Sequence, residues 1–454
     1  MKQVSKWQAI FLLTSIILII STSLLLFSAE PHVSIFFSII LLILFVLVTK
    51  RPWSLIEEGM KNGISSVINP IILFIFIGIL IAILMLSGTI PTIIYFGSTF
   101  MSPTFFLPSV FIITSIIGSC LGSAFTTIST VGVALLAVGS LMGIDSAIIA
   151  GAIVSGAYLG DKMSPLSDTT NLAAAVCKVD LFEHIKHMLW TTIPAFIMTL
   201  LLLTFVGFFL NWSPEQVGTN SEIVILKETG LVHSLSLIPL LLIFLLAWKR
   251  VPAILVLLSG IMAGLILAFI INPNLSITTI MNVIQNGFTI ETGSESINSM
   301  LNRGGIQSML WSISLVILTL TMGGIIQALG LLEKIFESIQ KVATTTGRLV
   351  LAVAFTAIGI NVTVGEQYLS ILLTGNVYKD EFDKRGLSNK NLSKIIEDAG
   401  TVINPLIPYG VSGVFIASVL NVPVIEYLPF AFFCLLSPLL SIFYGFTGIS
   451  MKKV

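Results

Sequence analysis

Long apolar runs separated by short polar segments follow one another along the whole chain. Ten of these runs are close to the roughly 20 residues that a membrane-spanning helix needs. They cover residues 8–28, 33–49, 67–87, 146–176, 188–210, 231–248, 252–271, 306–329, 395–421 and 428–447. The pattern predicts an all-α protein that crosses a membrane many times.

Two further apolar stretches, residues 104–141 and 349–378, are each interrupted midway by small polar residues. The interruptions read GSCLGSAFTTIST near residue 124 and GINVTVGEQ near residue 363. Each limb is expected to be shorter than a bilayer crossing. We therefore predict two re-entrant hairpins.

Short sequence matches recur at a nearly constant spacing. Gly63-Ile64-Ser65-Ser66 returns as Gly305-Ile306-Gln307-Ser308, and Gly88 and Gly330 have the same offset of 242 residues. Pro165-Leu166 and Pro405-Leu406 are separated by 240 residues. This spacing predicts two homologous halves, residues 1–210 and 231–454, joined by an extracytoplasmic linker over 211–230.

The few charges predict the orientation of the halves. Only 10% of residues are charged, the formal net charge is zero and the mean hydropathy is +1.05, so a nucleic-acid partner has no electrostatic support. Lysines and arginines fall on one side, with the N- and C-termini in the cytoplasm, if each half has five spans and one hairpin. Five is odd, so the fold class is two inverted repeats, each with a broken helix.

The run from Gly156 to Asn171, GAYLGDKMSPLSDTTN, is unusually polar for a membrane span. Gly156, Gly160 and Pro165 are expected to unwind the helix and free backbone carbonyls. Hard oxygen donors suit Na⁺ better than a transition metal. The candidate ligands in this run are Asp161, Ser164, Asp168, Thr169 and Asn171, with Asp161 and Asp168 as the Na⁺-binding carboxylates. A solvated loop beginning at Gly160 is the alternative.

The second half carries a comparable polar break at IEDAGTVINPLIPYG. We expect Asp398, Thr401 and Asn404 to contribute to the site from this segment, beside Glu397. The hairpin tips are expected to close the cavity. The tip candidates are Thr126, Thr127, Asn361 and Glu366.

Other kinds of chemistry have little support. His184 and His187 lie in a charged segment and are expected to face solvent. No HExxH or GxGD motif indicates an intramembrane protease, and no phosphate-binding loop indicates ATP use. The chain is therefore predicted to be no enzyme and to need no cofactor beyond Na⁺ as the transported ion.

The segment SGAYLGDKMSPLSDTTNLA at 155–173 resembles the signature of the NhaC-type sodium/proton antiporters of bacteria, within the ion transporter superfamily. Glu397 to Pro408 resembles that family's second motif, and the likeness covers essentially the whole chain. The resemblance implies inverted five-helix repeats with re-entrant hairpins. One departure is Tyr409-Gly410, where relatives tend to carry Trp-Asn.

The prediction from these features is Na⁺/H⁺ exchange by alternating access across the bacterial cytoplasmic membrane. The partners are Na⁺, H⁺ and the lipid bilayer, and a homodimer is one oligomeric state left open. The alternative is Na⁺- or H⁺-coupled exchange of small carboxylates such as malate and lactate, or of amino acids, with Lys162 as a counter-charge.

Overall fold

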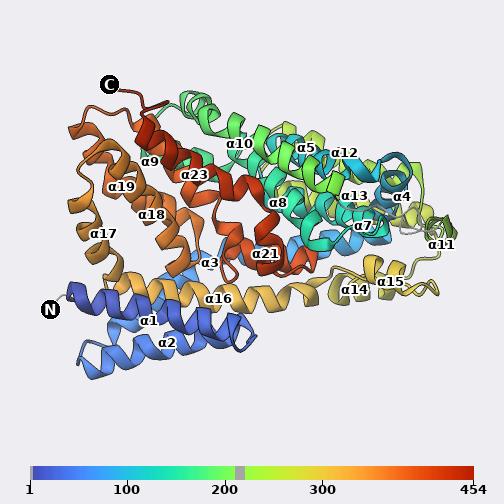
Figure 1. Ribbon diagram of the computed structural model, residues 1–454. Coiled ribbons are helices and arrows are strands. Elements are labelled where there is room, and N and C mark those ends of the chain that lie inside the picture. The colour runs from blue at the N-terminus through green and yellow to red at the C-terminus, as the bar shows by residue number, and fades with distance from the viewer. Residues whose placement is uncertain (1–3, 210–219, 454) are drawn as a thin grey trace.

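A computed structural model describes residues 4–209 and 220–453, and this part of the chain folds into helices without a β-strand (Figure 1). Nine described helices are long and apolar enough to cross a membrane, or up to eleven if each of two bent pairs counts as one span. The prediction of an all-α, many-span membrane protein is confirmed. Residues 211–219 of the predicted linker lie outside the described residues, and Asn220–Glu228 form helix α11.

The helices of the first half follow the predicted order. They are α1 (Lys6–Leu25), α2 (Pro31–Val48), α3 (Ser54–Leu86), α4 (Thr89–Phe100), α5 (Pro103–Leu121), α6 (Ala124–Thr127), the π-helix η1 (Ile128–Gly132), α7 (Val133–Leu141), α8 (Ser146–Met163), α9 (Asp168–Val176) and α10 (Leu181–Phe209).

The remaining helices follow α11, and two short helices, α14 and α15, lie between α13 and α16. Its elements are η2 (Ser234–Leu237), α12 (Ile238–Trp248), α13 (Ala253–Ile271), α14 (Ile277–Asn286), α15 (Glu295–Leu301), α16 (Ile306–Ala328), α17 (Leu331–Val342), α18 (Thr346–Val364), α19 (Gln367–Lys384), α20 (Asn389–Ile396), the π-helix η3 (Glu397–Thr401), η4 (Asn404–Leu406), α21 (Val411–Leu420), α22 (Val424–Tyr427), η5 (Leu428–Phe430) and α23 (Phe432–Thr447).

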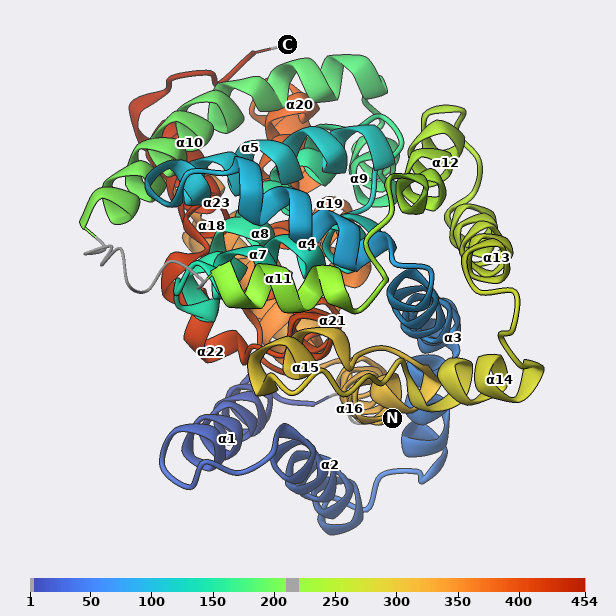
Figure 2. The same ribbon diagram turned by 90° about the vertical axis from the view of Figure 1, so that its right-hand side faces the viewer.

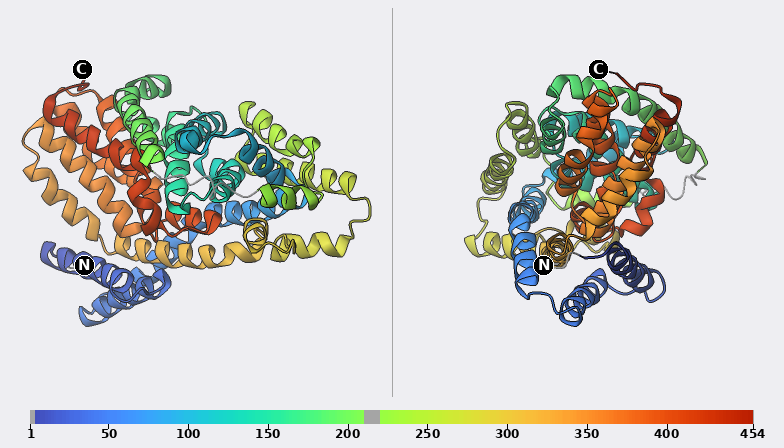
Figure 3. Two further views of the ribbon diagram at one scale, coloured as in Figure 1. Left: turned by 45° about the vertical axis from the view of Figure 1, so that its right-hand side comes forward. Right: turned by 90° about the vertical axis from the view of Figure 1, so that its left-hand side faces the viewer.

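Helices α3 and α16 cross in close contact along much of their length. A Cβ added at Gly63 would lie 2.1 Å from the Leu320 carbonyl oxygen, and the Gly305 N–H donates to the Gly78 carbonyl at 2.7 Å. Small residues let the two backbones approach in this way. The α1–α2 pair lies at one edge of the molecule against α16, and α12 and α13 lie beyond α3 (Figures 2 and 3).

Both interrupted stretches fold as antiparallel helical hairpins. The tips turn at Gly122 and Gly365, which have φ values of +64° and +77°. The base of the first closes where Gly139 meets the Phe106 ring, and the base of the second closes where Arg385 donates to the Ala343 carbonyl. The prediction that every limb is shorter than a bilayer crossing is wrong, because α5, residues 124–141 and α18 are 18 or 19 residues long and apolar.

The predicted span 146–176 is broken, but only over residues 164–167, between α8 and α9. Pro165 lies in this break. Gly156 and Gly160 do not unwind the helix as predicted. They remain helical because they serve close packing: a Cβ at Gly156 would lie 2.0 Å from Thr114 Oγ1, and one at Gly160 would lie 2.4 Å from the Ser115 carbonyl oxygen, both on α5.

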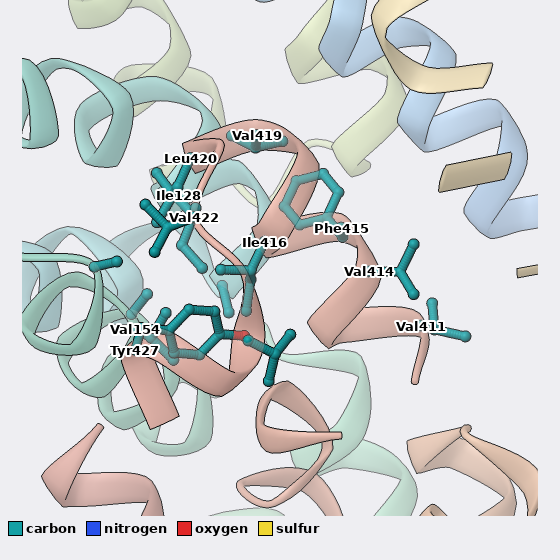
Figure 4. Packing of buried hydrophobic residues seen from close by; sticks show 14 of the residues in the cluster. Ile128, Val154, Val411, Val414, Phe415, Ile416, Val419, Leu420, Val422 and Tyr427 are labelled. Carbon is teal, nitrogen blue, oxygen red and sulfur yellow. The ribbon is translucent and has the colours of Figure 1, made fainter. Parts of the chain in front are cut away.

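The predicted span 395–421 is also broken, and its two parts bend by 44°. After α20 the chain passes through η3 and η4, and α21 begins only at Val411. Figure 4 shows side chains of α21 packed in one apolar cluster with Ile128 of η1 and Val154 of α8. The second-half break is thus held against the first half.

Candidate functional site

A cavity of about 780 Å³ lies where the first broken helix meets both hairpin tips. Its wall includes α3, the α12–α13 loop, the start of α19 and the break between α8 and α9. The predicted site residues that line it are Thr126, Asp161, Asp168, Thr169 and Glu366. The structure therefore gathers five of the twelve predicted site residues around one cavity.

Asp161 lies on the last turns of α8, where the helix approaches its break. Its exposed fraction is 7%, and the Ser167 side chain and the Ala124 backbone N–H act on its carboxylate as hydrogen-bond donors. Asp168 begins α9, lines the same cavity and is exposed. The break thus brings two carboxylates to one cavity, one enclosed and one open.

Hydroxyl groups surround these carboxylates. Ser167 caps α9 by accepting from the Thr170 N–H, and its Oγ lies 3.0 Å from Thr169 Oγ1. Ser167 was not among the ligands predicted from the sequence. A serine directly before the first residue of a helix is nevertheless a typical N-cap. Among the described residues, no group of three or more His, Cys, Asp or Glu side chains is placed to hold a metal ion. The oxygen donors at the break are the carboxylates of Asp161 and Asp168 and the hydroxyl groups of Ser167 and Thr169.

Each hairpin tip is ordered by a side chain that caps the following helix. Ser123 accepts from the Thr126 N–H at 3.2 Å, and Glu366 accepts from the Leu369 N–H at 2.6 Å. Thr127 is fully buried and donates to the Ser123 carbonyl instead of lining the cavity. One Glu366 oxygen is therefore engaged in capping at the cavity wall.

Asn361 and Asn404 lie away from the cavity and bind each other. Asn404 Nδ2 donates to Asn361 Oδ1 at 2.8 Å, and Asn404 Oδ1 accepts from the Ser412 N–H at 2.9 Å. Asn361 also donates to the Gly400 carbonyl at 2.7 Å. These bonds tie the second hairpin to the second broken helix, which is a bracing role and not the ligand role that we predicted.

Asp398 forms a buried ion pair with Lys162, so the two halves are joined by opposite charges. Both side chains are fully buried. Ser437 donates to Asp398 Oδ1 at 2.6 Å, and Ser441 donates to Oδ2. We expected Asp398 to contribute oxygens to the site, but both of its oxygens are engaged in these contacts. Lys162 is paired as well and is not a free counter-charge.

This arrangement could hardly be predicted from the sequence. Lys162 and Asp398 are 236 positions apart, and both serines come from α23, which we read as a plain apolar span. The one available signal was the four-residue spacing of Ser437 and Ser441, which places both on one helix face.

The other predicted ligands are distributed around the breaks. Ser164 is buried and its Oγ accepts from the Leu166 N–H, while Asn171 Nδ2 donates to the Pro165 and Ser167 carbonyls. These three hydrogen bonds stabilise the unwound segment. Thr401 is buried on η3 with no hydrogen bond to its hydroxyl among the described residues.

His184 and His187 are buried, so the prediction that they face solvent is wrong. His184 Nδ1 lies 2.8 Å from Ser393 Oγ, and His187 Nε2 lies 3.0 Å from Asn391 Oδ1. The physical reason is that α20 packs over this face of α10 and covers both rings.

A second cavity, of about 820 Å³, is lined by the loop between α1 and α2, by α16, by the end of α21 and by the segment that follows α21. Phe74, Phe125 and Phe415 have ring centroids 4.5–6.2 Å apart. Phe125 lines the first cavity, while on α21 Phe415 lies between Val411, in the first cavity, and Ala417, in the second. We call this cluster of three rings the aromatic barrier, since Phe415 lies along α21 between residues that line the two cavities.

Comparisons with known proteins agree on one family. Residues 156–449 match the model of the Na⁺/H⁺ antiporter family. The chain is 44% identical to the Na⁺/H⁺ antiporter NhaC of Alkalihalophilus pseudofirmus, over 98% of this chain and 96% of that protein. It is 42% identical to NhaC of Bacillus subtilis, over 96% of this chain and 97% of that protein.

A more distant relative is named for a different exchange reaction. The malate-2H⁺/Na⁺-lactate antiporter of Bacillus subtilis is 35% identical over 87% of this chain and 84% of its own length. The family match and the near full-length identity to the two NhaC proteins establish the assignment: the chain belongs to the Na⁺/H⁺ antiporter family.

Proposed function

We propose that this protein exchanges Na⁺ for H⁺ across the bacterial cytoplasmic membrane, at a site centred on Asp161. The observation that carries the proposal is the cavity at the α8–α9 break, where an enclosed carboxylate meets hydroxyl oxygens and a second carboxylate. The names of its relatives support the same pair of ions. The coupling is competition: Asp161 holds either a proton or Na⁺.

The residues of the break have separate roles in this mechanism. Asp161 binds the cation, while Ser167 and Thr169 supply oxygens or orient the carboxylate through their hydroxyl groups. Asp168, being more exposed, attracts Na⁺ into the cavity. Carboxylate and hydroxyl oxygens suit a hard cation, and a charge within a membrane protein requires such partners.

An inverted repeat of residues 1–210 and 231–454 is supported by the α3–α16 crossing. Gly63 contacts Leu320, and Gly78 contacts Gly305. At an offset of 242 residues, Gly63 corresponds to Gly305 and Gly78 to Leu320, so the two contacts are exchanged copies of each other. Reciprocal contacts of this kind are expected about a two-fold axis, and two antiparallel equivalent helices imply opposite orientations in the membrane.

The two cavities support alternating access. The first cavity includes Arg250 and Pro252, in a loop assigned to the cytoplasm by its charge. The second includes Ser28 and Glu30, in a loop assigned to the opposite side. With the aromatic barrier between the cavities, this is the inward-facing arrangement, in which Asp161 communicates with the cytoplasmic side.

Coupled exchange of an organic anion is the second candidate, because the cavity is much larger than a bare ion and falls within the usual 300–1,000 Å³ of small-molecule pockets. The malate-2H⁺/Na⁺-lactate relative points the same way. One observation argues against this candidate: Lys162 is paired with Asp398 and does not line the cavity, so it is not placed to bind an anion there.

The two functions separate in a transport assay. The purified protein is reconstituted into proteoliposomes with an imposed pH gradient, and a pH-sensitive dye reports its decay. Na⁺ alone is expected to dissipate the gradient. If dissipation requires added malate, lactate or an amino acid, the organic-anion function replaces simple Na⁺/H⁺ exchange.

A further inference from the structure

Glu397 is a fully buried carboxylate that faces the Thr401 hydroxyl, and among the described residues neither of its oxygens has a hydrogen bond of ordinary length. It is the first residue of the π-helix η3, and short π-helices occur often at functional sites. A buried ionised carboxylate without a partner is costly, so such a group binds a cation or takes up a proton. Glu397 therefore needs an occupant that the side chains around it do not supply.

The charged and titratable groups facing Glu397 leave its charge uncompensated. Lys162 is the nearby cation, but it is already paired with Asp398. The other facing groups are Asp161 on α8, Cys177 after α9 and Tyr368 on α19. The groups that α18 and α23 contribute near η3, Asn361 and the pair Ser437 and Ser441, are neutral.

One layer of helices, formed by α9 and α19, lies between Glu397 and the Na⁺ cavity. Glu397 is not among the residues that line the cavity, but η3 packs against α9 and α19, which both supply cavity wall. Within the part of the chain that the structure describes, Gln367 Oε1 on the wall and Thr401 Oγ1, which faces Glu397 on η3, also have no hydrogen bond of ordinary length. Buried polar atoms without partners are typical positions for water, so these groups mark a polar path between the cavity and Glu397.

We propose that Glu397 is a second proton-binding group of the transport cycle, distinct from the Na⁺-binding carboxylate Asp161. A proton from the cavity adds to one Glu397 oxygen and later leaves from the same oxygen to the other side. A proton fits better than a second Na⁺, because it needs no coordination shell and no space. It also neutralises Glu397 without placing another metal charge near Lys162. This inference rests on the proposed Na⁺/H⁺ exchange.

The test is the number of protons exchanged per Na⁺, measured in proteoliposomes from the membrane potential at which net ²²Na⁺ flux stops under fixed ion gradients. Glu397→Gln is expected to keep ²²Na⁺/Na⁺ exchange at Asp161 and to lower the proton count by one. Glu397→Asp, which keeps a carboxylate, should restore the native count.

Two results would overturn the proposal. An unchanged proton count in Glu397→Gln would make Glu397 a structural group, and loss of ²²Na⁺/Na⁺ exchange in a folded variant would make it part of the Na⁺ site. Failure of the proposed function looks different, because the native protein would then show no Na⁺-dependent proton movement at all.

A measurement on the unmodified protein avoids dependence on the variants' folding. Dicyclohexylcarbodiimide reacts with protonated carboxyl groups in apolar surroundings, and peptide mass spectrometry locates the adduct. Labelling of both Glu397 and Asp161 should fall as the pH rises and should fall again when Na⁺ is added, because a proton that is exchanged for Na⁺ cannot remain on the Na⁺-loaded protein. Labelling of Glu397 that Na⁺ leaves unchanged, or no labelling of Glu397 at any pH, contradicts the proposal.

Discussion

In the proposed inverted repeat, Asp161 corresponds to Asn404, at an offset of 243 residues that also relates the helix N-caps Asp145 and Ser388. The offset of 240 residues between Pro165 and Pro405 would instead match Asp161 to Thr401. Asn404 is held by Asn361, whereas the position corresponding to Asn361 in the first half is Gly118. Asp161 therefore lacks the amide partner that holds Asn404, which agrees with the ion-binding role that we propose for it.

The two cavity aspartates are expected to respond differently to removal of their charge. Asp161→Asn should abolish Na⁺-driven proton movement, because the competing ions lose their shared carboxylate. Asp168→Asn should keep transport and raise the KM for Na⁺ by about tenfold, equivalent to about 1.4 kcal/mol of binding. Dye assays in proteoliposomes measure both. Asp380→Asn, an exposed change on α19, is the matched control, and equal effects of the two cavity variants would remove the distinction between their roles.

The Lys162–Asp398 pair predicts an unusual stability pattern. Lys162→Met should lower the free energy of unfolding by about 3–5 kcal/mol, because it leaves a buried charge unpaired. Adding Asp398→Asn should recover most of this loss, since neither charge then remains. Thermal unfolding in detergent checks the order. A double variant no more stable than Lys162→Met would show that the pair is not the source of the loss.

At the scale of elements, the sequence predicted what local composition controls. Apolar runs predicted the spans, and Pro165 among polar residues predicted the break at 164–167. Helix α3 was predicted from residue 67 but begins at Ser54, because the charged turns near Glu57 and Lys61 look like a loop without the packing of α16 against Gly59 and Gly63. The burial of the two histidines and the inter-half ion pair depend likewise on contacts between distant segments.

Helix α8 depends on its glycines for contact with α5. Gly156→Ala should destabilise the protein by about 1–3 kcal/mol, because its Cβ would meet Thr114 Oγ1 at 2.0 Å and force the helices apart. The control is Gly359→Ala on α18, where a Cβ would meet no atom within 4 Å and the loss of a helical glycine is favourable. Unfolding temperatures compare them, and a stable Gly156→Ala variant would contradict the packing role.

At the scale of the whole molecule, the two cavities and the barrier between them define the state of the transporter. The bends of both broken helices and both hairpin tips surround this region, so a movement of one half against the other would change which cavity Asp161 meets. The aromatic barrier is the contact that must open. Its three side chains come from α3, α6 and α21 and therefore from both halves of the chain.

Removing the barrier should uncouple transport. Phe125→Ala with Phe415→Ala is expected to join the cavities and to increase proton leak in the absence of Na⁺, because access would no longer alternate. Passive decay of a pH gradient in proteoliposomes measures the leak. The matched control is Phe205→Ala with Phe209→Ala, a contacting pair that is exposed on α10. If Phe125→Ala with Phe415→Ala does not increase the proton leak, the closed gate lies elsewhere in the protein.

The most direct test of competition at Asp161 is proton release upon Na⁺ binding. Na⁺ is added to the purified protein in weakly buffered detergent solution, while a pH indicator and ²²Na⁺ binding are followed together. We predict that the native protein binds Na⁺ and releases protons, and that Asp161→Asn does neither while remaining folded. Na⁺ binding without proton release, or native behaviour of the Asp161→Asn variant, would contradict exchange at this carboxylate.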